Sequence, residues 1–248
     1  MNRSVVGIGW DVGGWMGKKN AVAIAHWKPS ANVEWIGKPS VFLIPDDHPF
    51  CVKDLIDAVD DKKETINIEK DNIVIAIDAP LGYPKKYQEF IKGKPGIAQR
   101  PTNEIENLLA YRYTERWIQG SFKKKPLSAT FSSLGNCATV AISAVRRWSD
   151  ENGFAIVPFK KDNGKHIVIE VYPRIVKIDF IKKHLPSATL TPKMHEYDAC
   201  VCALMALAFR INKIGSKSFE IIHPPRDHMD LVKSEGWIYT VSKNRGKG

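Results

Sequence analysis

The sequence predicts an α/β protein whose central sheet is covered by helices on both faces. Two apolar segments of strand length, 5–10 and 73–77, end at Asp11 and Asp78, and residues that break regular structure follow each aspartate. Continuous apolar runs are typical of strands buried on both faces of a parallel or mixed sheet. Between them, apolar residues spaced three and four apart predict a helix over 52–59. If the two strands are parallel neighbours, both aspartates emerge at one edge of the sheet.

The first half of the chain is expected to contain five strands. After the turn that follows Gly14, the second strand returns antiparallel to the first as a hairpin. Short breaks at Gly37 and Pro39 separate the third and fourth strands. The helix over 52–59 then leads to the fifth strand by a crossover, which is right-handed in nearly all proteins. The expected strands are 5–10, 21–27, 32–36, 40–44 and 73–77.

The second half is expected to be richer in helices. Asn103 and Glu106 have the spacing of a capping box and predict a helix start. The most apolar helix of the chain is expected over 194–211. The other expected helices are 87–91, 103–120, 139–148 and 174–184, and the other expected strands are 154–157, 166–172, 219–222 and 237–241.

Composition indicates a folded protein with a basic surface. The 248 residues, 44% of them hydrophobic, are enough for one large domain, which we expect over 1–242, followed by a basic tail, 243–248. Lysine and arginine outnumber acidic residues by 37 to 27, giving a net charge of +10. Such a charge is compatible with a nucleic acid partner, although solubility alone explains it equally well.

Targeting and cysteine patterns favour a cytoplasmic protein without a membrane partner. Asp11 interrupts the short apolar run near the N-terminus, so no secretory signal is expected. The longest apolar stretch, 199–209, is too short to span a bilayer. The four cysteines lack the spacing of a zinc site, and free cysteines suit a reducing compartment.

Four acidic residues stand in segments that otherwise call for burial: Asp11, Asp78, Glu170 and Asp198. A buried carboxylate costs several kcal/mol unless it is paired, protonated or bound to a metal. Each has a structural explanation by itself; Asp78 can be a turn residue, and Asp198 can favour the N-terminal dipole of its helix. Together, on three strands and one late helix, they predict a shared catalytic site.

Clustered carboxylates suit Mg²⁺ or Mn²⁺, which prefer oxygen ligands. Two such ions about 4 Å apart can activate a water and stabilise the leaving oxygen of a phosphodiester. His195 lies three residues before Asp198, on the same face of the predicted helix, and can ligate metal, shuttle a proton or serve a structural role.

Four further residues are candidates for binding substrate. Lys18 and Lys19, just beyond Asp11, can face phosphates, although a solvated hairpin tip explains them equally well. Arg112 and Glu115 lie three apart on a predicted helix, so they can pair with each other or contact the substrate.

Several motifs occur in an order that resembles the domain-of-unknown-function family 429, described as predicted RNase H-like nucleases. The resemblance spans nearly the whole chain, and it rests on the ordered set more than on any single motif. The motifs are Gly9–Gly14, Ala76–Gly82, Arg112–Glu115, Glu170–Pro173, Tyr197–Ala203 and Glu235–Ile238.

The resemblance implies a ribonuclease H-like fold with a mixed sheet of five strands, the first three antiparallel, and helices on both faces. It also implies metal ligation by Asp11, Asp78 and Asp198, with Glu170 as a fourth ligand or a nearby acid. The segment His195-x-x-Asp198-Ala199 is similar to the end of Holliday-junction resolvases.

The chain departs from the family pattern at two places. Trp10 replaces the small aliphatic residue that is commoner before the first aspartate. A helical insertion around 85–150 includes the segment 92–126, which has no counterpart in a minimal ribonuclease H. The resemblance therefore supports the fold more than the reaction.

The leading hypothesis is a metal-dependent nuclease that hydrolyses DNA or RNA by a two-metal mechanism, without a nucleotide cofactor. One alternative is a small kinase or ATPase of the actin-like superfamily, which also opens with Asp-x-Gly-Gly after a strand. The sequence lacks a second phosphate loop and any Gly-x-x-x-x-Gly-Lys-Ser/Thr loop. A second alternative is a non-catalytic basic protein that binds nucleic acid on the same scaffold.

Overall fold

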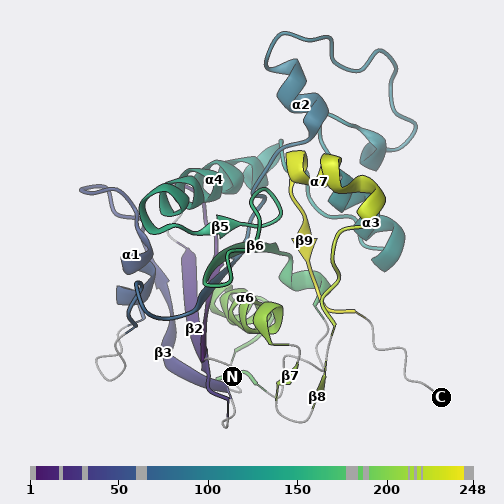
Figure 1. The fold of residues 1–248 in the computed structure, drawn as a ribbon. Helices are drawn as coiled ribbons and strands as arrows, with labels where there is room; N and C mark the ends of the chain where they lie inside the picture. Colours follow the sequence, from purple (N-terminus) through teal and green to yellow (C-terminus); the bar gives the residue numbers. More distant parts are fainter. Residues whose placement is uncertain are drawn as a thin grey trace, which may run out of the picture.

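Figure 1 shows the computed structural model of the chain, in which the residues that are not described are drawn in grey. The described residues are 4–16, 19–29, 33–59, 66–176, 184–186, 190–211, 213–214, 217–218 and 220–242. Lys18, most of the helix expected over 174–184 and the basic tail 243–248 lie outside them. Within the described residues, no helix has both the length and the apolar character needed to cross a membrane.

A mixed seven-stranded sheet forms the centre of the fold. Its main order is β3-β2-β1-β4-β6; β2 is antiparallel to both neighbours, whereas β1, β4 and β6 are parallel. The strands are β1 (Val5–Asp11), β2 (Asn20–Trp27), β3 (Val33–Phe42), β4 (Ile73–Asp78), β5 (Ala155–Ile156), β6 (His166–Val171) and β9 (Ile238–Tyr239). The expected α/β class and the antiparallel arrangement of the first three strands are confirmed.

The expectation of a five-stranded sheet is wrong, because two short strands extend the edge beyond β6. Parallel β5 pairs with Ile167 and Val168 in the first half of β6. Parallel β9 pairs with Glu170 and Val171 in the second half. One strand edge therefore receives two separate partners in succession.

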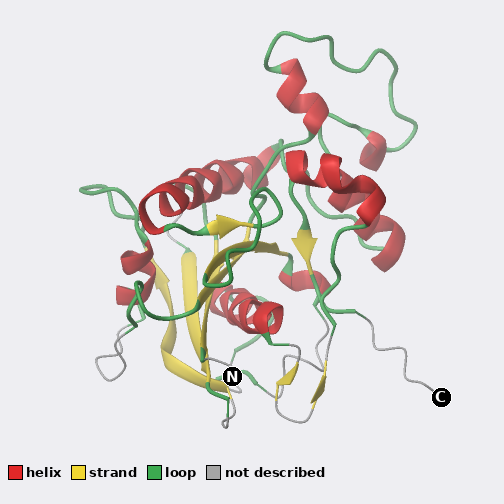
Figure 2. Ribbon diagram, viewed as in Figure 1, coloured by secondary structure: helices red, strands yellow, loops and turns green. Residues whose placement is uncertain are grey.

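Helices cover both faces of the sheet, as expected (Figure 2). One face packs against α6 (His195–Arg210), and the other packs against α1 (Val52–Asp57) and α4 (Ser132–Asn152). The other described elements are α2 (Lys85–Phe90), α3 (Tyr113–Phe122), α7 (Met229–Glu235), the strands β7 (Lys213–Ile214) and β8 (Lys217–Ser218), and the 3₁₀ turns Glu104–Glu106, Pro173–Ile175 and Arg226–His228.

Three predicted elements, two strands and a helix, differ clearly from the structure. Residues 33–42 form one strand, β3, whose pairing with β2 shifts around Gly37, which has a positive φ of 61°. The two predicted strands are thus one strand with a bulge. The capping box at Asn103 is present, but it caps a single 3₁₀ turn, and the α-helix begins ten residues later at Tyr113.

Successive side chains of β1 point to opposite faces of the sheet, where they meet different helices. Ile8 and Trp10 face α1 and α4, where the Trp10 ring lies 5.2 Å from Phe50 and 5.6 Å from Trp148. Gly7 and Gly9, together with Asp11, face the opposite side, since successive strand residues point to opposite faces. The bulky Trp10 side chain therefore packs on the opposite face of the sheet from the Asp11 carboxylate.

Close packing of α6 on β1 requires these glycines. A Cβ atom on Gly9 would lie 1.9 Å from the carbonyl oxygen of Ala199, and one on Gly7 would lie 2.6 Å from that of Ala203. Both distances are far inside van der Waals contact, so no larger residue fits without moving the helix. Because α6 begins at His195, this packing brings its first turn to the end of β1.

We expect Gly9→Ala to lower the free energy of unfolding by about 1–3 kcal/mol, because the added methyl group must displace the α6 backbone. Denaturant unfolding followed by circular dichroism measures this change. Gly120→Ala is the matched control, since a Cβ on Gly120 meets no atom within 4 Å, and alanine in a helix should raise stability by up to about 1 kcal/mol. Equal effects of the two substitutions would contradict the packing account.

Candidate active site

Asp11 and Asp78 are direct neighbours at the end of two parallel strands. They are paired in the register of β1 and β4. Adjacent strands lie about 4.8 Å apart, and paired residues of parallel strands project to the same face. The predicted meeting of these two aspartates at one sheet edge is therefore confirmed.

The first turn of α6 adds two more titratable side chains to this edge. His195 Nδ1 lies 2.5 Å from Asp11 Oδ2, and Asp11 is 8% exposed. Asp198 lies one turn further along the helix, and its Oδ2 is 4.0 Å from Nε of Arg174, just after β6. Asp11, Asp78 and Asp198 thus line one cleft with His195. Glu170, the fourth acid of the predicted cluster, also lines it.

The carboxylates of this cluster are held at raised pKa values. Burial raises the pKa of Asp78 well above its ordinary value, and the charges of Asp11 and Asp198 add to the effect. Burial and Asp11 raise the pKa of Asp198 to about 6, against the opposing influence of Arg174. Burial raises the pKa of Asp11 even though His195 lowers it.

Asp78 is the least compensated member of the cluster. Within the described residues, no hydrogen bond or ion pair reaches its carboxylate, whereas Asp11 has His195 and Asp198 has the distant Arg174. A carboxylate that is mostly buried without a partner favours the neutral form or a bound cation. Burial is the main cause of the raised pKa values, and the charges of neighbouring carboxylates add to it.

The donor set is chemically suited to Mg²⁺ or Mn²⁺, because all three carboxylates offer hard oxygen atoms. In the described part of the chain, no group of three or more His, Cys, Asp or Glu side chains is positioned to hold a metal ion. Mg²⁺ does not need such a group, since it is commonly bound through one or two carboxylates and retains several waters. The unpartnered Asp78 beside Asp11 meets that requirement.

The acidic edge opens into a cleft of about 470 Å³. Two basic residues that the sequence analysis did not single out, Lys124 and Arg174, line it together with Tyr172. Lys124 Nζ donates to the Arg174 carbonyl oxygen at 2.9 Å and lies 5.6 Å from the centre of the Tyr172 ring. Arg174 could have been anticipated, because it follows β6 at the same sheet edge as the aspartates.

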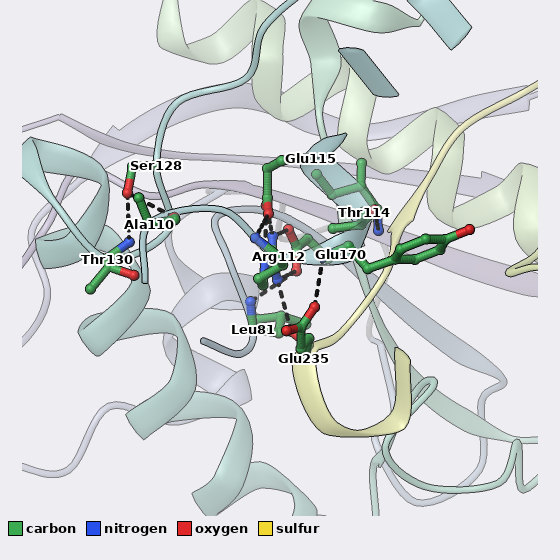
Figure 3. A network of polar contacts seen from close by, with 11 residues as sticks. Leu81, Ala110, Arg112, Thr114, Glu115, Ser128, Thr130, Glu170 and Glu235 are labelled. Atoms are coloured by element: carbon green, nitrogen blue, oxygen red, sulfur yellow. Dashed lines mark hydrogen bonds and ion pairs between the residues drawn. The ribbon is translucent and has the colours of Figure 1, made fainter. Parts of the chain in front are cut away.

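Figure 3 shows a buried ion-pair network at the N-terminus of α3. Its members Arg112, Glu115 and Glu170 line the same cleft as the aspartates. Arg112 is fully buried, and its guanidinium contacts the carboxylates of Glu115 and Glu170. Its Nη1 lies 2.7 Å from Glu170 Oε2 and 3.2 Å from the Glu235 carbonyl oxygen, and its Nε lies 2.8 Å from Glu115 Oε1. The contacts satisfy all five N–H donors of the guanidinium.

Glu170 connects this network to the loop after Asp78. Its Oε2 accepts a hydrogen bond of 2.9 Å from the Leu81 backbone N–H. The same carboxylate therefore ties the end of β6 to α3 and to the segment that leaves β4. These contacts fix the path of the backbone on which Asp78 is carried.

Glu235 performs a similar task at two helix starts. Its Oε1 accepts from the backbone N–H of Lys85 at 2.7 Å, and its Oε2 accepts from that of Tyr113 at 2.6 Å. These are the first residues of α2 and α3, whose unpaired N–H groups favour a carboxylate. Gly236 follows with a φ of 95°, and a Cβ there would lie 3.1 Å from Arg112 Nη1.

These contacts change the roles expected for three residues. Arg112 and Glu115, expected to bind substrate, are buried and bonded to each other, so their polar groups are not available to a ligand. Glu170, expected as a catalytic acid, has both oxygens engaged by Arg112. Sequence spacing had allowed the Arg112–Glu115 pair but not the partnership with Glu170, which lies 58 residues away.

The hairpin tip after Asp11 is held by a buried side chain that sequence reasoning missed. Asn20 Oδ1 accepts hydrogen bonds from the Gly13 backbone N–H at 2.9 Å and from Trp10 Nε1 at 3.2 Å. Lys19 beside it is exposed. It does not line the cleft, while Lys18 lies outside the described residues.

Comparisons of the chain with protein-family models, with curated proteins and with solved structures find no match. The class of protein must therefore be argued from the geometry of the fold and the cleft.

Removal of Arg112 should strongly destabilise the protein, because it leaves two carboxylates buried without their cation. We expect Arg112→Met to lower the free energy of unfolding by about 3–5 kcal/mol. Arg147→Met is the control; its partner Glu151 is 3.7 Å away and both side chains are exposed, so about 0–1 kcal/mol is expected. Denaturant unfolding of both variants tests this difference, and a loss below 1 kcal/mol for Arg112→Met would refute it.

The raised pKa of Asp198 predicts a specific pH dependence. Between the ordinary pKa of 3.8 and the folded value of about 6, the native protein binds the proton more tightly than the unfolded chain. The stability that Asp198 contributes therefore falls as pH rises through this interval. In EDTA, we expect Asp198→Asn to lose less stability than wild type as the pH rises from 4 to 7. Relative to wild type, the variant should therefore be more stable at pH 7 than at pH 4. Parallel stability curves for the two proteins would exclude this shift.

Proposed function

We propose that the protein is a metal-dependent nuclease that hydrolyses phosphodiester bonds of DNA or RNA. The observation that carries this proposal is the alignment of Asp11 with Asp78 at the carboxyl ends of two parallel strands, with Asp198 on the helix packed beside them. Three hard carboxylates in a cleft with a basic margin combine a cation site with a place for phosphate.

The strand order supports a ribonuclease H-like scaffold. A meander of β3, β2 and β1 is followed by parallel β4 and β6, and the late helix α6 packs on β1. This arrangement agrees with the antiparallel first three strands that the resemblance to family 429 implies. The additional short strands β5 and β9 pair with β6, at the opposite edge of the sheet from β3. They do not interrupt the order β3-β2-β1-β4-β6.

Each residue of the cleft then receives a role. Asp11, Asp78 and Asp198 would hold one or two Mg²⁺ or Mn²⁺ ions, which when bound supply the Lewis acidity that activates water and stabilises the leaving oxygen. Arg174 and Lys124 would bind the phosphate flanking the scissile bond. These roles assign ion binding and phosphate binding to separate side chains.

His195 would act beside Asp11. Its Nδ1 faces Asp11, which leaves Nε2 as the ring nitrogen that can exchange a proton with substrate or solvent. The contact with Asp11 also fixes the orientation of the imidazole ring.

Buffer containing Mg²⁺ or Mn²⁺ should support cleavage of single- or double-stranded DNA or RNA, and EDTA should abolish it. We expect Asp78→Asn to lower the cleavage rate at least about 100-fold, because bound metal ions supply several kcal/mol of transition-state stabilisation. Gel analysis of labelled oligonucleotides measures the rate. Asp57→Asn is the control, since Asp57 is an exposed residue of α1 paired with Lys53.

Thermal melting with and without metal separates the nuclease from the other classes. A metal that binds the native state raises the melting temperature of wild type, and Asp78→Asn should lose this increase. Stabilisation by nucleotide instead would favour the kinase alternative. Nucleic acid binding without cleavage in any divalent metal would favour a non-catalytic binder.

A further inference from the structure

The cleft combines its acidic edge with an apolar surface that phosphate chemistry does not require. Pro126, Leu127 and Leu134 line the same cleft as Asp11 and Asp78. Leu127 is 58% exposed, so its side chain is accessible to a ligand in the cleft. Phe131, at the start of α4 and between these two leucines in sequence, is also exposed.

An apolar surface beside a phosphodiester site has a specific use in nucleic acid recognition. In a duplex the apolar faces of the bases are stacked and the backbone presents charged phosphates and sugars. Only an unstacked base offers its face to protein side chains, and stacking on such surfaces is tolerant of sequence. An apolar surface within this cleft is therefore matched by an unpaired nucleotide and not by the outside of a double helix.

The size of the cleft points to the same ligand. A volume of about 470 Å³ lies in the range of sites for small organic molecules, which are about 300–1,000 Å³. This volume holds a nucleotide unit and its neighbouring phosphate, whereas a duplex would have to remain outside. An extruded or unpaired nucleotide can enter and bring its phosphate to Asp11 and Asp78.

The basic groups of the cleft are few. Among the described residues that line it, Arg112 is fully engaged by carboxylates, and Lys124 and Arg174 are the remaining lysine and arginine side chains. Two cations neutralise about two phosphates, far fewer than the 6–10 contacts made by strongly salt-dependent duplex-binding proteins. The affinity must then include a large contribution from base contacts.

We infer that the cleft selects single-stranded nucleic acid, with an unpaired base against Leu127 and Leu134 and its phosphate at Lys124 and Arg174. The inference rests on the proposed nuclease function for the identity of the acidic edge. It goes further by naming the substrate class and the residues that select it.

Binding can be measured separately from cleavage. Wild-type protein in EDTA is titrated into a fluorescein-labelled single strand of DNA, the same strand of RNA, and each strand annealed to its complement, and anisotropy is recorded. The single strands should bind at least about tenfold more tightly than the duplexes, since only they expose base faces. For two phosphate contacts, the logarithm of their affinity should fall with the logarithm of salt concentration with a slope of about −1.4.

Leu127→Ala should weaken binding of the single strands about fivefold or more and leave the weak duplex binding unchanged. Leu43→Ala is the matched control, because Leu43 is 66% exposed and does not line the cleft. Lys124→Ala should also weaken binding of the single strands, and it should reduce their salt slope by about 0.7. Thermal melts establish that each variant is folded.

The outcomes distinguish this inference from the nuclease proposal. Tight single-strand binding without cleavage in Mg²⁺ or Mn²⁺ would leave the substrate class supported and refute the nuclease. Metal-dependent cleavage of duplexes as fast as single strands, with no effect of Leu127→Ala, would keep the nuclease and overturn the inference. Failure of all four probes to bind would overturn the inference as well.

Discussion

The close packing of α6 on β1 is the constraint on which the cleft depends. Gly7 and Gly9 give the helix backbone room to approach the strand at distances that exclude any Cβ atom. The first turn of α6 therefore meets the end of β1, where His195 contacts Asp11 and Asp198 adds its charge. The resulting concentration of carboxylates is unfavourable by itself. The interior packing that surrounds it supplies the free energy that keeps the acids together, as functional sites commonly require.

A buried ion-pair network in the wall of the cleft holds the segments around it in place. Arg112 joins the start of α3 to Glu170 at the end of β6, and Glu170 in turn binds the backbone after Asp78. Glu235 caps α2 and α3 from α7. Buried ion pairs contribute little net stability, but removing one partner is costly, so such a network favours a single arrangement of the segments it joins. The acids near the edge thus divide into the three aspartates, which Arg112 does not contact, and the two glutamates, Glu115 and Glu170, that pair with Arg112.

The sequence predicted the α/β sheet and the aspartates at its edge, because both follow from local patterns. Apolar runs that end at Asp11 and Asp78 identify adjacent parallel strands, and a pairing in register brings the aspartates together. Partners of buried side chains could not be predicted in the same way. Glu170 resembled the other acids in sequence, and only the tertiary contact with Arg112 distinguishes it. Strands were predicted where β5 and β9 lie, but their place in the central sheet was not, because the pairing of such short strands depends on long-range contacts.

Anomalous diffraction from a crystal soaked in Mn²⁺ tests the central claim most directly. The account predicts a manganese peak in the cleft within coordination distance, about 2.0–2.3 Å, of carboxylate oxygens from Asp11 and Asp78, with Asp198 as a direct or water-linked ligand. It also predicts that Glu170 remains bound to Arg112 in that crystal. A manganese-soaked crystal with no peak at this edge, or with its peak on Glu170 and Arg112 displaced, would contradict the account.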